Sequence, residues 1–81
     1  MARPSPHYAG DPALVKIGRV IRAMRSEAGL SQESLAHEAG VDRSYMGGVE
    51  RGEHNLTMIS LLRICKCLNV DAWELLRRAD V

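Results

Sequence analysis

The chain has 81 residues and a formal net charge of +1 at pH 7, which allows one small domain and excludes a uniformly basic surface. A domain of this length favours support from a partner subunit, and any patch that binds nucleic acid has to be local. Apolar residues make up 46% of the chain and aromatic residues only 4%. This composition predicts an aliphatic core built from helices packed on helices.

The two cysteines, Cys65 and Cys67, are separated by one residue. On a helix they would point about 200° apart, so they would form neither a disulfide with each other nor a shared metal site. A reducing cytoplasm is therefore the expected compartment. The N-terminus lacks an apolar stretch of signal-peptide length, and no segment approaches the roughly 18 apolar residues of a membrane span. We expect a soluble, cytoplasmic, nucleoid-associated protein.

The first residues predict an arm followed by a long helix. Residues 1–11 contain two prolines and a glycine without an apolar period, and we expect them to be flexible. Asp11 and Pro12 then supply an N-cap and a first-turn proline for a helix over residues 12–28. This helix opens a single domain that covers residues 12–81.

Two short helices follow, separated by about three residues. Ser31 caps the first of them, which ends at Gly40, and Asp42 caps the second, which ends near Gly52. Two short helices joined by a tight turn with glycine are the pattern of a helix-turn-helix, whose second helix enters the DNA major groove. A helical hairpin inside a small bundle explains the spacing equally well.

Two further helices complete the chain. Thr57 caps a fourth helix that ends at Leu68, and Asp71 and Glu74 have the spacing of a capping box for a fifth helix through about Ala79. No segment shows the alternation of a strand. The fold class predicted from the residues is all-α, with five short helices.

The segment "GLSQESLAHEAGVDRSYMGGVERGEHNLTMISLLRICKCLNV", residues 29–70, resembles the lambda-repressor-type helix-turn-helix of the XRE family. The matching pieces are Gly29-Leu30-Ser31-Gln32, Leu35-Ala36, Gly40-Val41, Val49-Glu50-Arg51-Gly52 and Leu68-Asn69-Val70. With the first and last helices the match extends over about residues 13–78. The resemblance implies a compact five-helix domain with the helix-turn-helix at helices 2 and 3, and the helix after Gly40 as the recognition helix.

The resemblance also implies which residues read bases. The N-terminal residues of the recognition helix contact base edges in this family, and here these residues are Arg43 and Ser44. Arginine can pair bidentately with guanine O6 and N7, whereas serine discriminates less between bases. Arg43 is therefore the leading specificity residue.

Further residues are expected at the DNA backbone or at the edge of the groove. Gln32 lies in the first turn of the second helix, where family members touch a phosphate and free N–H groups favour an anion. Tyr45 either binds phosphate through its hydroxyl or serves as a partly buried packing residue. Arg51, His54 and Asn55 lie where family members grip the backbone again, and such contacts confer salt dependence without reading sequence.

Gly47 and Gly48 stand in the middle of the recognition helix, where each costs roughly 1 kcal/mol relative to alanine. Missing side chains would let this helix approach DNA closely, or they would leave it flexible until DNA binds. In either case alanine at these positions is expected to stabilise the free fold. The resemblance further implies a structural ion pair between Arg25 and Glu50 that ties the recognition helix to the first helix.

The fourth helix is apolar over more of its circumference than one core face needs. One stripe suits the core, and it consists of Leu61, Ile64, Cys65 and Leu68. The remaining apolar side chains are candidates for a homodimer interface, and they are Met58, Ile59, Leu62 and Trp73. Burial of the whole helix within one monomer is the alternative.

An enzyme is not expected. His7, His37 and His54 lie in different elements and none has another His or Cys at i+3 or i+4, and neither a phosphate-binding loop nor a nucleophile motif is present. No metal, cofactor or small-molecule ligand is implied.

The leading hypothesis is a sequence-specific transcriptional regulator that binds double-stranded DNA as a homodimer on a roughly palindromic operator. The size resembles the controller proteins of restriction–modification systems and small phage-type repressors. An antitoxin-type interaction module, which would cover a partner protein with its apolar fourth and fifth helices, is the alternative.

Overall fold

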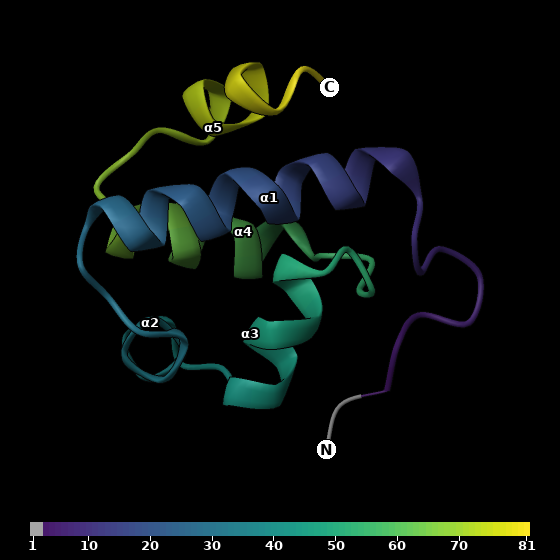
Figure 1. The fold of residues 1–81 in the computed structure, drawn as a ribbon, viewed down its shortest axis with the longest axis horizontal. Coiled ribbons are helices and arrows are strands. Elements are labelled where there is room, and N and C mark those ends of the chain that lie inside the picture. Colours follow the sequence, from purple (N-terminus) through teal and green to yellow (C-terminus); the bar gives the residue numbers. More distant parts are fainter. Residues whose placement is uncertain (1–2) are drawn as a thin grey trace.

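The computed structural model describes residues 3–81, and five helices make up most of this part of the chain (Figure 1). They are α1 (Pro12–Glu27), α2 (Gln32–Ala39), α3 (Arg43–Glu50), α4 (Met58–Cys67) and α5 (Ala72–Ala79). No strand occurs among the described residues. The predicted all-α fold with five helices is confirmed, although α1, α3 and α4 each end slightly earlier than predicted. The start of the expected arm, residues 1–2, lies outside the described residues.

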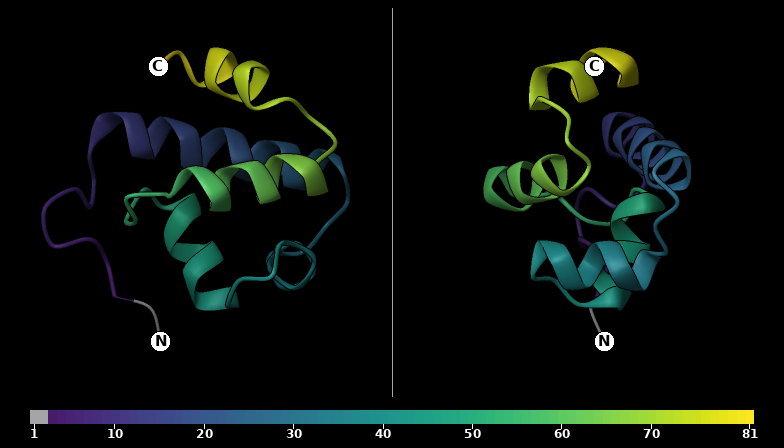
Figure 2. Two further views of the ribbon diagram at one scale, coloured as in Figure 1. Left: turned by 180° about the vertical axis from the view of Figure 1, so that it is seen from behind. Right: turned by 90° about the vertical axis from the view of Figure 1, so that its left-hand side faces the viewer.

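The long helix α1 crosses the middle of the molecule and separates α5 from the α2–α3 pair (Figure 1). It contacts α5 on one side and α3 on the other, while α4 contacts both α2 and α5 (Figure 2). The first described residues of the N-terminal segment lie on the α3 side, and the C-terminus lies at α5. This arrangement leaves α2 and α3 together at one end of the molecule.

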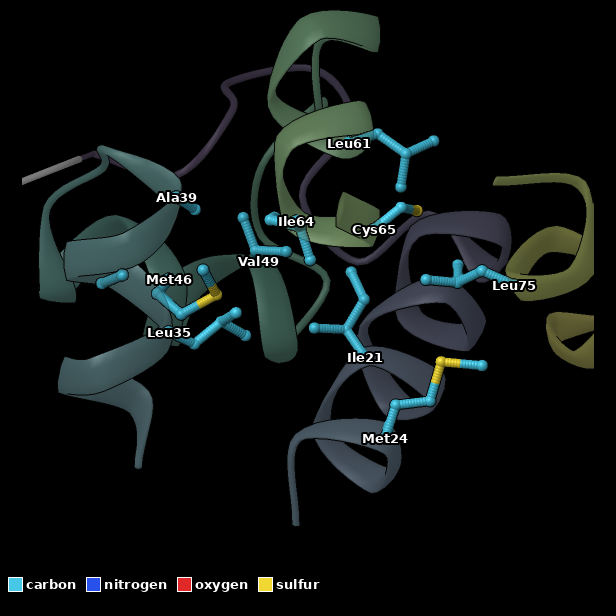
Figure 3. Close-up of a cluster of buried hydrophobic side chains, with 11 residues drawn as sticks. Ile21, Met24, Leu35, Ala39, Met46, Val49, Leu61, Ile64, Cys65 and Leu75 are labelled. Atoms are coloured by element: carbon cyan, nitrogen blue, oxygen red, sulfur yellow. The ribbon is translucent and has the colours of Figure 1, made fainter. Parts of the chain in front are cut away.

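The core takes one completely buried side chain from each helix (Figure 3). These side chains are Ile21, Leu35, Met46, Ile64 and Leu75. Burying an aliphatic side chain of this size contributes roughly 1.5 to 3 kcal/mol before the entropy of ordering it is counted. Every helix thus contributes to one core, in which α3 packs directly on α1 and α2.

Three of the five predicted side-chain caps form and two do not. Side-chain oxygens accept hydrogen bonds from first-turn backbone N–H groups at Asp11, Ser31 and Thr57. Asp42 and Asp71 occupy N-cap positions, but their side chains make no such bond. The N–H of Glu74 instead donates to the backbone oxygen of Asp71 at 3.1 Å, so the predicted capping box between these two residues is wrong. At Asp42 the backbone carbonyl, and not the side chain, accepts a hydrogen bond from the first turn of α3: the N–H of Met46 donates to it at 3.0 Å.

A left-handed glycine makes the turn between α2 and α3. Gly40 has φ 72°, and its N–H donates to the oxygen of His37 at 3.2 Å, which closes the end of α2. A residue with a Cβ rarely adopts this conformation. The chain can thus turn sharply within three residues and start α3 steeply inclined to α2 (Figure 1).

Gly18 allows α1 and α3 to cross in backbone contact. It is buried, and a Cβ atom there would lie 2.6 Å from the backbone oxygen of Glu50 and would also collide with that of Val49. Real Cβ atoms do not come so close to a carbonyl oxygen. The end of α3 is therefore held directly against α1.

Candidate nucleic-acid interface

A shallow depression of about 350 Å³ lies where α2 and α3 meet the N-terminal segment. Its lining residues are Pro4, Gln32, Arg43, Ser44, Gly47, Arg51 and Glu53. Five of these seven are residues for which the sequence predicts a DNA contact, while Pro4 and Glu53 were not predicted. The depression gathers cationic and hydrogen-bonding side chains from the two helices of the predicted helix-turn-helix.

A larger groove, of about 510 Å³, lies between α4 and α5. Its lining includes Leu62, one of the predicted interface residues, and none of the residues predicted to contact DNA. Size alone does not identify a site for an elongated polyanion, which is bound by exposed donors and positive charge. The chemistry of the side chains therefore favours the smaller depression as the nucleic-acid site.

The two predicted base readers lie at the start of α3. Arg43 is exposed and Ser44 is half-buried, and both side chains line the depression. Their helix is fixed by Met46 and Val49, which are buried in the core (Figure 3). The predicted readers are thus carried by a helix that is anchored in the core.

Glu50 joins α1, α2 and α3 through hydrogen bonds. Nε of Arg25 donates to Glu50 Oε2 at 2.6 Å and Nη2 donates to Oε1 at 3.1 Å. The two side chains are only 13% and 2% exposed, and the predicted ion pair is present. The hydrogen bond with Glu50 raises the pKa of Arg25 above its ordinary value, so the guanidinium group stays protonated. Arg25 also donates to the backbone oxygen of Leu30 at 2.8 Å.

Gln32 belongs to the same network. Its Nε2 donates to Glu50 Oε1 at 3.0 Å, so part of the amide is used inside the protein. A phosphate needs a donor, and the Gln32 side chain keeps one amide hydrogen for such a contact. Gln32 therefore links the buried Glu50 to the depression, a connection that the sequence did not predict.

Tyr45, Gly48 and His54 pack against one another. The rings of Tyr45 and His54 are stacked, with centroids 4.6 Å apart and planes 17° apart. A Cβ atom on Gly48 would overlap the His54 ring, which is itself only 8% exposed. Gly48 and His54 are therefore not available at the DNA surface as predicted, since each covers the other. Tyr45 is half-buried, in accord with the packing alternative.

The predicted backbone-contacting arginine is already paired. Arg51 is exposed, and its Nε and Nη2 donate to the two carboxylate oxygens of Glu53 at 2.9 and 3.2 Å. Two residues of opposite charge at this spacing were visible in the sequence, which is the signal that could have identified Glu53. Asn55, in the loop that follows α3, is exposed and does not line the depression.

Other kinds of site are poorly supported by the described residues. Over residues 3–81 no group of three or more His, Cys, Asp or Glu side chains could hold a metal ion. In the same part of the chain no helix is long and apolar enough to cross a membrane. Cys65 and Cys67 are free, and burial raises the pKa of both thiols.

Comparisons with known proteins agree with this geometry. A family model described as a helix-turn-helix domain matches residues 16–79. The control protein C.SmaI of Serratia marcescens is 43% identical over 58 residues, which cover 72% of this chain and 69% of that protein. The control protein C.BamHI of Bacillus amyloliquefaciens is 37% identical over 60 residues, covering 73% and 74% of the two chains.

Solved structures give the same result. The crystal structure of the restriction-modification controller protein C.AhdI from Aeromonas hydrophila matches with a TM-score of 0.75 and 47% identity, over 76% of this chain and 94% of that one. The wild-type restriction-modification controller protein C.Esp1396I matches with a TM-score of 0.75 and 39% identity, over 84% and 92%. The family model covers most of the chain, and both solved structures share the fold of this chain. The chain therefore belongs to the helix-turn-helix domain family.

Proposed function

We propose that this protein is a sequence-specific DNA-binding transcriptional regulator that controls restriction–modification genes. The observation that carries the proposal is that one depression, at the α2–α3 end of the fold, brings together Arg43, Ser44, Gln32, Gly47 and Arg51. The kinship with control proteins of restriction–modification systems supports the choice of genes. It also supports a regulator over the antitoxin-type alternative. The protein acts without catalysis, in the cytoplasm, with residues 1–11 as an arm and residues 12–81 as its DNA-binding domain.

The regulator acts as a homodimer on a roughly palindromic operator. Four large apolar side chains on α4 and α5 support this proposal, and they are Met58, Ile59, Leu62 and Trp73, exposed by 64%, 59%, 46% and 63%. Exposed apolar side chains of this size are typical of protein contacts when they lie together. Two recognition helices joined in this way would enter successive major grooves about one helical turn apart.

The experiment that tests the proposal is selection of DNA by the protein from a random-sequence duplex library, followed by genomic footprinting and salt titration. We expect a recovered site with two-fold symmetry and an affinity that falls as salt rises. Binding without sequence preference, or no binding at low salt, would contradict the proposal.

Replacing Arg43 by alanine separates base reading from backbone contact. The Arg43→Ala variant is expected to lose about 1 to 3 kcal/mol on the selected duplex and to relax the preference at one base position per half-site. Arg51→Ala serves as the matched comparison, because a lost phosphate contact weakens all sequences similarly. Repeating the selection with each variant measures the difference. If both variants weaken every sequence uniformly, Arg43 does not read bases.

A further inference from the structure

Arg51 has its guanidinium group occupied in the free protein. Glu53 accepts from Nε and Nη2 with both carboxylate oxygens, which is the bidentate geometry that arginine also uses to bind phosphate. The Arg51 and Glu53 side chains are 60% and 34% exposed, so the pair forms in contact with water. A phosphate and the Glu53 carboxylate therefore compete for the same donors.

Glu53 is held in this place by its backbone. Its N–H donates to the oxygen of Gly48 at 2.9 Å, and its oxygen accepts from the N–H of Ser5 at 2.7 Å. The residue is thus attached on one side to α3 and on the other to the N-terminal segment. These bonds fix the backbone of residue 53 and so keep the Glu53 side chain near Arg51.

The charge of Glu53 faces the depression that holds the predicted base readers. Among the residues that line this depression, Glu53 is the acidic one. Glu50, the carboxylate at the end of α3, is buried and accepts hydrogen bonds from Arg25 and Gln32. The hydrogen bonds from Arg51 lower the pKa of Glu53, which keeps it ionised at neutral pH. DNA that approaches the depression meets this negative charge.

We infer that Glu53 sets the affinity of the protein for DNA through Arg51, by competing with DNA phosphate for its guanidinium group. The inference rests on the proposed function. An exposed ion pair is weak, so phosphate can displace the carboxylate, but the displaced charge then lies beside the DNA backbone. Every duplex meets this opposition, so at a given protein concentration only one that also satisfies Arg43 and Ser44 binds tightly enough to be occupied. Glu53 thus lowers the affinity for all duplexes by a similar factor, and the difference between their affinities is left to Arg43 and Ser44.

The test compares the wild type with Glu53→Gln on two probes, a duplex selected by the wild-type protein and the unselected random-sequence duplex. Glutamine keeps the size and removes the charge. We expect Glu53→Gln to bind the unselected duplex about threefold to tenfold more tightly, with a log–log salt slope steeper by up to about 0.9 per protomer. The selected duplex should gain by a similar factor, so the ratio of the two affinities should stay close to that of the wild type.

Two comparisons assign the effect to the pair with Arg51. Glu27→Gln makes the same charge change at α1, where Glu27 lies 3.6 Å from Arg78, and should leave both affinities unchanged. In an Arg51→Ala background, Glu53→Gln should have a smaller effect, because the competition has been removed and only the repulsion between Glu53 and phosphate remains. Thermal unfolding checks that each variant is folded.

Three results would overturn the inference. They are wild-type affinities in Glu53→Gln, an equal change in Glu27→Gln, and an undiminished effect of Glu53→Gln without Arg51. A wild-type protein that selects no duplex would instead contradict the proposed function, so the two failures are distinguishable.

Discussion

Gly47 and Gly48 are neighbours in α3 but have different surroundings. A Cβ atom on Gly47 would meet Nη1 of Arg51 at 3.0 Å, which is the far end of a flexible and exposed side chain. A Cβ atom on Gly48 would enter the ring of the buried His54. Gly47 is therefore a position where bulk can be accommodated, whereas the volume missing at Gly48 is filled by another residue.

Gly48→Ala is expected to destabilise the fold by about 1 to 3 kcal/mol, because His54 would have to leave its stacked place on Tyr45. This reverses the sequence-based prediction that alanine would stabilise both positions. The free energy of unfolding in urea measures the effect.

Gly47→Ala is the matched control, since the gain in helix propensity, up to about 1 kcal/mol, is opposed only by a shift of Arg51. Equal stability of the two variants would show that His54 does not fill the space at Gly48.

The backbone of α3 was predictable from the sequence, whereas the packing of Gly48 was not. Apolar spacing and turn residues define a helix locally, and they predicted α3 well. The ring that covers Gly48 comes from the loop after α3, and no periodicity describes the path of a loop. The pairing of Arg51 with Glu53 depends on the same loop, and so it too was missed.

At the scale of elements, one carboxylate connects three helices. Glu50 lies at the end of α3 and binds Arg25 of α1 and Gln32 of α2. The resemblance to a known family implied the pair with Arg25, but it gave no indication that Gln32 shares the same oxygen. The predicted phosphate-binding residue and the structural ion pair thus belong to a single network.

Glu50→Gln is expected to lower the free energy of unfolding by about 3 kcal/mol, because it leaves the charge of the mostly buried Arg25 without its partner. Urea unfolding of the variant measures this loss. The exposed pair of Glu27 and Arg78 provides the control, and Glu27→Gln should cost less than about 0.5 kcal/mol. Similar losses in the two variants would mean that the Arg25–Glu50 pair is no stronger than a surface pair.

At the scale of the whole molecule, the exposed apolar side chains and the proposed base readers lie on different helices. The proposed base readers are on α3, while the exposed apolar side chains are on α4 and α5. Association through α4 and α5 would therefore leave the depression open to DNA. The sequence already separated a core stripe on α4 from its remaining apolar side chains, and the structure confirms that Met58, Ile59 and Leu62 are exposed.

Ile59→Glu is expected to raise the dimer dissociation constant by more than about tenfold, because a charge would be placed in an apolar contact. Sedimentation equilibrium over a range of protein concentrations measures the change. Val81→Glu is the comparison, since Val81 is also exposed and apolar but lies at the C-terminus. If Ile59→Glu assembles as the wild type does, the interface lies elsewhere.

The backbone crossing of α1 and α3 at Gly18 does not depend on the side chains that are proposed to read DNA. α3 meets α1 there through the carbonyl oxygens of Val49 and Glu50, and not through the side chains that face outward. Exchanges at Arg43 or Ser44 therefore leave the crossing untouched. A lineage could acquire a new operator by changing those two positions while it inherits the same frame, and a designer could do the same.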